Sequence, residues 1–236
     1  EFYYHIDDLF SQDNSFIYIL DSMDSLSSIS ELEKFQEQKN AYRKGRNAPG
    51  SYGDGKAKVN SSGLRKLIPK LRETESILII ISQTRDNVGT FSFDKKTRSG
   101  GHALRFYASL ELWLSIKGRI RKTVKGQDEH LGVICKVQVK KNRITGRERS
   151  VEIPIYYSTG VDDTGSCVNF LIDRKHWSKD GSIIHAKEFG YKGSSESIIE
   201  NVENKDGEFQ ELRKIVTGVW QEIEDACEVQ RKIRYN

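Results

Sequence analysis

Two short apolar stretches decide the fold of this sequence: Phe16–Ser22 reads FIYILDS, and Ser76–Ser82 reads SILIIIS. Each is rich in β-branched or aromatic residues and ends in a polar residue, as buried strands of a parallel sheet do. Between them we expect helices over residues 28–38 and 61–74, around a glycine-rich polar stretch at 40–57. This strand, helix, strand order predicts an α/β fold with a mostly parallel central sheet and flanking helices.

The middle of the chain predicts additions to that sheet. A polar connection over residues 84–101 leads into a short helix at 102–108. Alternating polar and apolar residues then predict an antiparallel edge, with strands over 110–116, 132–140 and 149–157 and a tight turn after the second of these strands.

The last third of the sequence predicts a small helical region. One of its two expected helices carries an apolar stripe of the kind that usually packs in a core, at Phe209, Leu212, Val216, Val219, Ile223 and Ala226. We therefore expect a main domain over residues 1–165 and a C-terminal α-rich region over 166–236.

Composition excludes several classes of protein. The 236 residues are 36% hydrophobic and 31% charged, and no apolar run approaches the roughly 20 residues that a membrane span needs. The three cysteines form no CxxC pair, which argues against a disulfide scaffold or a cysteine zinc cluster and fits a reducing compartment. We expect a cytoplasmic protein that does not enter a membrane.

Basic residues concentrate in one segment, although the net charge is only +4. They are Lys117, Arg119, Arg121, Lys122, Lys125, Lys136, Lys140, Lys141, Arg143, Arg147 and Arg149. A polyanionic partner and a solvated charged hairpin explain this segment equally well.

The stretch Gly50–Ala57 nearly spells the phosphate-binding pattern GxxxxGK[ST]. Such a loop must follow a buried strand, and its last position must be a hydroxyl that holds magnesium. Here a polar segment precedes it and Ala57 occupies that position, so we interpret it as a glycine-rich surface loop.

The two expected strands each deliver a polar side chain to the same edge of the sheet. Asp21 ends the first strand and can orient a magnesium ion, although a simple strand cap is the commoner reading of one such residue. Gln83 follows the second strand, at the edge where open α/β sheets bind their ligands. This pair predicts a nucleotide site.

The connection after Gln83 mixes aromatic and basic residues, namely Phe91, Phe93, Lys95, Lys96 and Arg98. Stacking faces and cations on one loop suit single-stranded nucleic acid, where each stacked base contributes roughly 1 to 3 kcal/mol. A disordered lid whose phenylalanines fold onto the core is the alternative.

These residues together resemble the RecA family of strand-exchange recombinases. The stretch Val88–Ser109, VGTFSFDKKTRSGGHALRFYAS, is similar to the second DNA-binding loop of the family and the helix after it. FIYILDS resembles the Walker B strand, Leu64–Leu67 (LRKL) the helix between the strands, and ISQTR the segment with the nucleotide-sensing glutamine. Val137–Gly146, VQVKKNRITG, resembles the basic residues that reach a neighbouring subunit's nucleotide. The resemblance covers about residues 16–165.

The resemblance implies ATP and Mg²⁺ as cofactors and assigns roles to individual residues. Asp21 would be the magnesium-orienting acid with Ser22 beside it, Gln83 the γ-phosphate sensor, and Lys141 and Arg143 the cations that act on a neighbour's nucleotide. Contact with DNA would come from Arg43, Lys44, Arg46, Arg85, Phe91, Phe93, Lys95, Lys96, Arg98, Gly100, Gly101 and Arg105. Partners would be single-stranded and double-stranded DNA and further copies of the chain in a helical filament.

The sequence also departs from the family pattern. The phosphate-binding loop and the catalytic glutamate lie upstream of the Walker B strand in the family, but only 15 residues precede Phe16 here and the first is not Met. We expect a truncated sequence rather than a natural pseudo-ATPase, and no ATP hydrolysis by this chain alone. His102 replaces the more usual Asn after the glycine pair, a change that we cannot interpret.

Three functions follow as hypotheses. The first is the core of an ATP-dependent recombinase that forms a filament on single-stranded DNA and promotes homologous pairing and strand exchange in recombinational repair and the SOS response. The second is a non-catalytic RecA-like paralogue that binds DNA or regulates filaments. The third is a hexameric helicase-type ATPase of the same fold.

Overall fold

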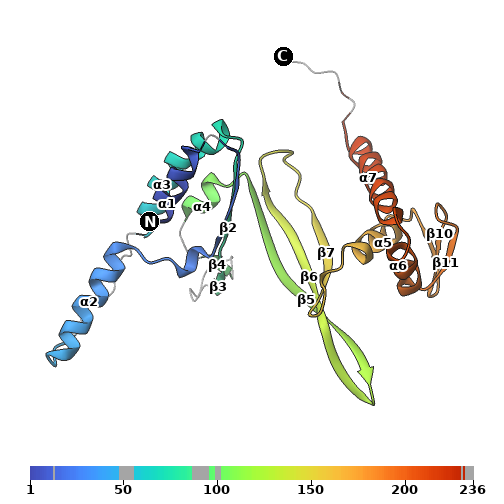
Figure 1. Cartoon of the computed structure of the whole chain (residues 1–236), viewed down its shortest axis with the longest axis horizontal. Coiled ribbons are helices and arrows are strands. Elements are labelled where there is room, and N and C mark those ends of the chain that lie inside the picture. The colour runs from blue at the N-terminus through green and yellow to red at the C-terminus, as the bar shows by residue number, and fades with distance from the viewer. Residues whose placement is uncertain (13, 48–55, 87–95, 99–101, 230, 232–236) are drawn as a thin grey trace. The chain divides into compact units, whose positions relative to one another are not determined.

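The computed structural model describes residues 1–236 except 13, 48–55, 87–95, 99–101, 230 and 232–236. The chain divides into two compact units, Glu1–Glu111 and Leu112–Asn236, and each is described here by itself (Figure 1). The expected division into residues 1–165 and 166–236 stays a prediction.

The first unit is built around two parallel strands. β1 (Ile17–Asp21) pairs with β2 (Ile77–Ile81) in a register that sets Ile17 opposite Ile77 and Asp21 opposite Ile81. Between these strands in sequence lie the 3-10 turn η1 (Met23–Ser25) and the helices α2 (Ile29–Arg43) and α3 (Lys56–Glu73). The expected strand, helix, strand order is therefore confirmed.

Three further elements complete this unit. Helix α1 (Phe2–Phe10) precedes β1, the short strands β3 (Thr84–Asp86) and β4 (Lys96–Arg98) follow β2, and α4 (His102–Tyr107) comes next. The core of the unit contains the buried residues Met23, Leu64 and Leu104, with Leu20, Leu78 and Ile80 of the strands packed against them. One face of the β1–β2 sheet is therefore covered by helices.

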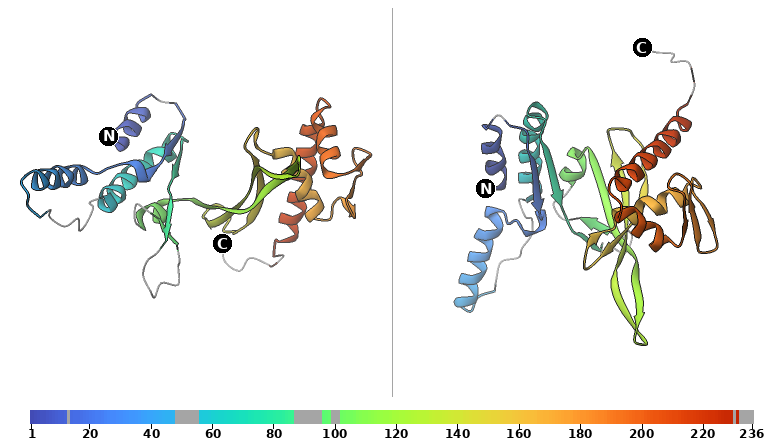
Figure 2. Two further views of the ribbon diagram at one scale, coloured as in Figure 1. Left: turned by 90° about the horizontal axis from the view of Figure 1, so that it is seen from below. Right: turned by 45° about the vertical axis from the view of Figure 1, so that its right-hand side comes forward.

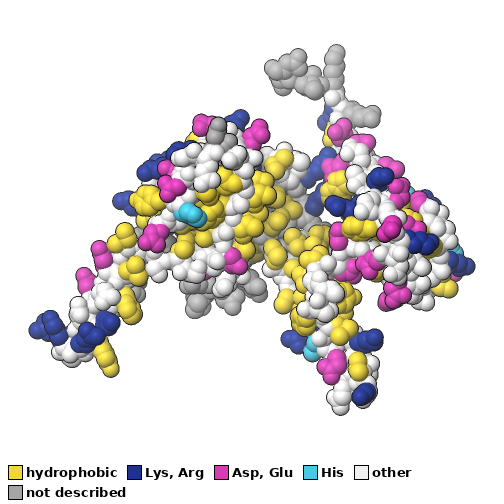
Figure 3. Space-filling view, in the orientation of Figure 1, with side chains coloured by type: hydrophobic (Ala, Val, Ile, Leu, Met, Phe, Trp, Pro, Cys, Tyr) yellow, Lys and Arg dark blue, Asp and Glu magenta, His cyan; other side chains and the backbone are white. Residues whose placement is uncertain are grey.

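The opposite face of the β1–β2 sheet corrects our expectation of fully buried strands. Exposed and half-buried residues alternate along both strands, and Ile17, Ile19, Ile77, Ile79 and Ile81 are exposed by 44 to 65%. Hydrophobic side chains gather at the surface over this part of the chain (Figure 3). The runs are apolar on both faces, but within the described part of the chain only one of those faces is covered.

The second unit contains a four-stranded sheet in the order β5-β6-β7-β8. β5 (Leu110–Val124) and β6 (Gln127–Asn142) are much longer than expected, and their turn projects beyond the rest of the unit (Figure 2). β6 pairs antiparallel with β7 (Ser150–Tyr156), and β7 with β8 (Gly160–Val161). An α/β class with parallel and antiparallel pairing is thus confirmed, but the two pairings lie in separate sheets rather than in one central sheet.

The C-terminal part contains more than the expected helices. Helices α5 (Asp163–Asp173), α6 (Ser195–Glu203) and α7 (Glu208–Ala226) accompany a small antiparallel sheet, in the order β11-β10-β9, formed by β9 (Ser178–Asp180), β10 (Ile183–Ala186) and β11 (Tyr191–Gly193). Leu212 and Val219 of the apolar stripe are buried in the core, and Phe209, Val216 and Ile223 pack against it. The stripe is therefore core packing, as predicted.

A polar group joins the small sheet to the end of α5. Both oxygens of Glu188 accept hydrogen bonds, Oε2 from Trp177 Nε1 and Oε1 from His176 Nε2, each at 2.6 Å. Burial by itself would raise the pKa of Glu188, but these hydrogen bonds and the nearby His176 outweigh it and the pKa is lowered. Trp177, only 1% exposed, is thereby fixed at both its ring and its N–H.

No helix in the described part of the chain has the length and apolar character needed to cross a membrane.

Candidate functional site

The two predicted nucleotide-site residues lie at or just after the ends of two neighbouring strands, at the carboxyl edge of the β1–β2 sheet. Asp21 is the last residue of β1 and lies opposite Ile81, and Gln83 stands two residues beyond Ile81. The side chains of Asp21 and Gln83 are both exposed, and Ser22 is half-buried. The parallel pairing predicted from the sequence therefore places a carboxylate and an amide at the same edge of the sheet.

Asp24 ties the two segments together, and we did not expect it from the sequence. Its Oδ2 accepts a hydrogen bond from the backbone N–H of Gln83 at 2.7 Å. Ser25 Oγ donates to the backbone carbonyl of Ser22 at 2.7 Å, which closes the turn that holds Asp24. The available signal was an acidic residue three positions after Asp21, in a segment that must turn sharply away from the strand.

The donor atoms at this edge suit a hard cation. Mg²⁺ prefers carboxylate oxygen, phosphate oxygen and water, and it is commonly held by one or two carboxylates. Asp21 supplies such an oxygen, whereas the described residues contain no group of three His, Cys, Asp or Glu side chains placed to hold a metal ion. Asp21 is the residue at this edge that would hold a magnesium ion bound to a phosphate ligand.

The loop predicted to bind DNA begins and ends in a short antiparallel ladder. Thr84, Arg85 and Asp86 of β3 pair with Arg98, Thr97 and Lys96 of β4. Arg85, Lys96 and Arg98 thus lie on this ladder, although their side chains are outside the description. Phe91, Phe93, Lys95, Gly100 and Gly101 lie outside the described residues, as does most of the Gly50–Ala57 stretch.

The remaining predicted DNA contacts lie on helix ends. Arg43 is the last residue of α2, and Lys44 and Arg46 follow it, all three exposed. Arg105 in α4 is 62% exposed, and its Nε lies 3.7 Å from Oε2 of the buried Glu111. Arg105 therefore has a structural partner within the first unit as well as a solvent-facing side.

The two predicted trans-acting cations lie at the start of an ordered turn in the second unit. Lys141 and Asn142 end β6, and Arg143 opens the turn. Asn142 Oδ1 accepts from the backbone N–H groups of Ile144 and Thr145, and Asn142 Nδ2 donates to Thr145 Oγ1 and to the carbonyl of Arg147. The side chain of Asn142 thus replaces backbone pairing and fixes the turn.

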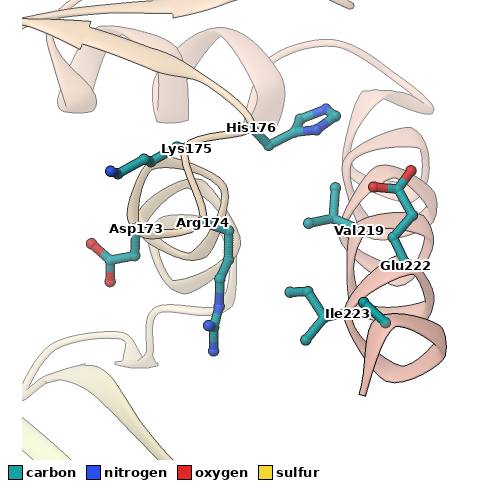
Figure 4. A pocket seen from close by; sticks show the side chains of 8 residues that line it. Asp173, Arg174, Lys175, His176, Val219, Glu222 and Ile223 are labelled. Carbon is teal, nitrogen blue, oxygen red and sulfur yellow. The ribbon is translucent and has the colours of Figure 1, made fainter. Parts of the chain in front are cut away.

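An open groove lies elsewhere in the second unit, between the end of α5 and α7 (Figure 4). Val219 and Ile223 point from α7 toward α5, while Arg174 and His176 come from the residues at and after the end of α5. None of the predicted site residues lines this groove.

The fold defines a class, the α/β proteins, and in open sheets of this class ligands bind at the carboxyl edge of the parallel strands. Comparison with known proteins is more specific. The RecA N-terminal domain family matches residues 17–162, more than half of the chain. The chain belongs to the RecA family.

Curated relatives match this chain over 126 to 178 residues. It is similar to protein RecA of Geobacter metallireducens, at 32% identity over 178 residues, 75% of this chain and 49% of the relative. Similarity to protein RecA of Clavibacter michiganensis is 33% over 126 residues, 53% of this chain and 34% of the relative. Similarity to protein RecA of Chlamydia muridarum is 28% identity over 158 residues, which are 67% of this chain and 44% of the relative. The chain spans about half the length of these relatives or less.

Proposed function

We propose that this chain is the core of an ATP-dependent DNA recombinase. It would bind single-stranded DNA as a filament, pair it with double-stranded DNA and promote strand exchange. The observation that carries the proposal is the family match over residues 17–162, which includes every residue of the edge formed by Asp21 and Gln83.

The proposed nucleotide chemistry divides among residues of this chain. Asp21 would orient Mg²⁺ on the phosphates of ATP, with Ser22 beside it, and Gln83 would sense the γ-phosphate. The hydrogen bond from Gln83 N–H to Asp24 supports a link between these roles, because it ties the residue after β2 to the turn after β1. When bound, ATP would supply the free energy of hydrolysis and a change of nucleotide state. These side chains would bind its Mg²⁺ and detect its γ-phosphate.

Assembly follows from the proposed roles of Lys141 and Arg143. A cation that a subunit contributes to its neighbour's nucleotide site neutralises transition-state charge and can raise the rate by about 10³ to 10⁵. Such a contact is heterologous, and a heterologous contact that does not close generates an open helical filament.

Contact with DNA would rest on the β3–β4 ladder and on the aromatic and basic residues between its strands. Phosphate contacts by Arg and Lys make binding salt-dependent, and base stacking makes it tolerant of sequence. The exposed cluster Arg43, Lys44 and Arg46 would add phosphate contacts.

The experiment is an anisotropy titration of labelled single-stranded DNA with this chain. We expect binding that falls steeply between about 50 and 200 mM salt and varies little with sequence. Replacing Phe91 and Phe93 by Ala should weaken it about tenfold or more, since two stacking faces are lost. The control is Tyr157→Ala, which removes an aromatic ring that is 68% exposed in the second unit.

Two outcomes would contradict the proposal. Affinity that does not change with salt would exclude phosphate contacts as its source. An unchanged affinity of the double Phe variant would exclude the loop. DNA binding indifferent to ATP in the complete natural protein would favour the non-catalytic paralogue, and ring assembly without DNA would favour the helicase-type ATPase.

A further inference from the structure

One carboxylate on α7 holds both arginines at the end of the β6–β7 turn. Glu224 Oε2 accepts a hydrogen bond from Arg147 Nη1, and Glu224 Oε1 accepts one from Arg149 Nη2. The three side chains are 25 to 33% exposed, so water screens their attraction less than it would on an open surface. We call Arg147, Arg149 and Glu224 the arginine clasp.

The arginine clasp is anchored to the core of the second unit. The guanidinium of Arg149 lies 4.5 Å from the ring centroid of Trp220, which precedes Glu224 by one helical turn on α7. Trp220 in turn packs on Phe170 of α5, with ring centroids 6.1 Å apart. A carboxylate and an indole spaced four residues apart therefore receive Arg149 together.

The clasp connects to the turn through its backbone. The carbonyl of Arg147 accepts from Asn142 Nδ2 at 3.1 Å, and the N–H of Gly146, with φ of +74°, donates to the carbonyl of Asn142 at 3.1 Å. After the turn, the carbonyl of Arg149 accepts from Val139 N–H at 2.8 Å, which resumes the pairing with β6. Holding Arg147 and Arg149 on α7 thus fixes where Asn142 and its two neighbours lie.

We propose that Glu224 is a positioning residue for Lys141 and Arg143. It holds the β6–β7 turn against α7 so that these two cations meet the phosphate groups of a neighbouring subunit's nucleotide in one fixed geometry. This inference rests on the proposed function, because it takes from there the role of Lys141 and Arg143. It adds a contribution of the C-terminal helix to phosphate recognition.

Charge and geometry predict opposite effects when Glu224 is changed. Glu224 is negative, so its removal makes the turn more positive, and a purely electrostatic role predicts tighter binding of a polyanion. A positioning role predicts weaker binding, since the two cations must then be ordered at the moment of contact. The sign of the effect therefore separates the two roles.

The experiment titrates the chain with inorganic tripolyphosphate and follows the backbone amide signals of residues 141–143 by NMR. We expect Glu224→Gln to raise the dissociation constant by about threefold or more, because ordering the turn then opposes binding. The matched control is Glu222→Gln, the same change of charge two residues earlier on α7. It should leave binding unchanged or tighten it slightly.

A second variant guards against a trivial loss of stability. Glu224→Asp keeps the charge but shortens the side chain by one methylene, so it should weaken tripolyphosphate binding without making the turn more positive. Hydrogen exchange at Ile144 and Thr145, whose N–H groups bond to Asn142, should quicken in both Glu224 variants. Amides of β6 and β7 distant from the turn should keep their protection, which an unfolded or globally weakened variant would not show.

Each result decides between the possibilities. Tighter or unchanged tripolyphosphate binding in both Glu224 variants, with single-stranded DNA binding intact, overturns the positioning role and leaves the proposed function in place. If the unmodified chain does not bind single-stranded DNA, that result contradicts the proposed function instead. Absence of any tripolyphosphate effect at residues 141–143 of the unmodified chain overturns the role of the cations and this inference with it.

Discussion

Glu188 illustrates at the scale of one residue how a charged group can stabilise this chain. Its carboxylate accepts from both Trp177 Nε1 and His176 Nε2, and Lys187 Nζ lies 3.8 Å from its Oε1. Burial alone would raise the pKa of Glu188, but the hydrogen bonds from Trp177 and His176 favour the ionised form, and the pKa is lowered. A group whose pKa is lowered by folding stabilises the fold while it is ionised.

We predict that Glu188→Gln lowers the free energy of unfolding at neutral pH by about 1 to 2 kcal/mol, the scale of hydrogen bonds to a charged group. The contribution of Glu188 is complete above its unfolded pKa and is lost as the pH falls through its lowered folded pKa. The difference in the free energy of unfolding between variant and parent should therefore shrink below about pH 4.3. Urea unfolding over a pH series measures it, with the exposed Glu203→Gln as control. A difference that stays constant down to pH 3 would contradict this explanation.

Single residues were predictable where a strand fixes their place. Asp21 and Gln83 follow apolar runs whose parallel pairing determines the edge at which they emerge, so composition and order suffice. Asp24 and Glu224 were missed because their partners are distant in sequence, 59 residues for Gln83 and 77 for Arg147. No local pattern encodes such contacts.

At the scale of elements, α2, α3 and α4 appear where periodicity predicted them, with boundaries shifted by a few residues. Ser28 and Glu31 form the capping box that starts α2. The small sheet β9–β11 was missed because its strands have only three or four residues, too few for alternation to show. The length of β5 and β6 was underestimated because their outer halves are mostly polar and show little alternation.

Two glycines inside helices lead to opposite predictions. A Cβ on Gly63 in α3 would lie 2.4 Å from the ring of Tyr3 in α1, whereas a Cβ on Gly218 in α7 meets nothing within 4 Å. Gly63→Ala should therefore destabilise the chain by about 1 to 3 kcal/mol through overpacking, despite its better helix propensity. Gly218→Ala should stabilise it by up to about 1 kcal/mol.

Thermal unfolding of the two glycine variants tests this pair of predictions. Tyr3 is also a local reporter, because burial raises the pKa of its hydroxyl to about 12. In Gly63→Ala the ring should move outward, and that pKa should fall toward its ordinary value near 10. If the pKa of Tyr3 does not change and Gly63→Ala is more stable than the parent, the packing of α1 on α3 does not require a glycine at position 63.

At the scale of the whole molecule, the two units differ in how complete their cores are. Among the residues that the structure describes, nine buried residues form the larger cluster, all of them in the second unit, and three form the cluster of the first. The second unit therefore has most of the buried apolar surface that a domain needs to fold alone.

We predict that residues 110–236, which keep β5 whole, unfold cooperatively as a separate protein. Near-ultraviolet circular dichroism should report the fixed environment of Trp177, and urea should give one sigmoidal transition. Binding of a hydrophobic dye together with a gradual transition would instead describe a molten state and contradict the prediction.

The five exposed isoleucines of β1 and β2 have a practical consequence. Within the described part of the chain, β1 and β2 form a two-stranded sheet with a bare β-branched face, and such a sheet is a template for strand addition. Short runs such as Ile77–Ile81 combine high β-propensity with no charge. We expect this surface to promote aggregation of the chain when it is expressed. We predict that Ile79→Lys raises the soluble yield of the chain, because it places a charge in the middle of this exposed apolar face.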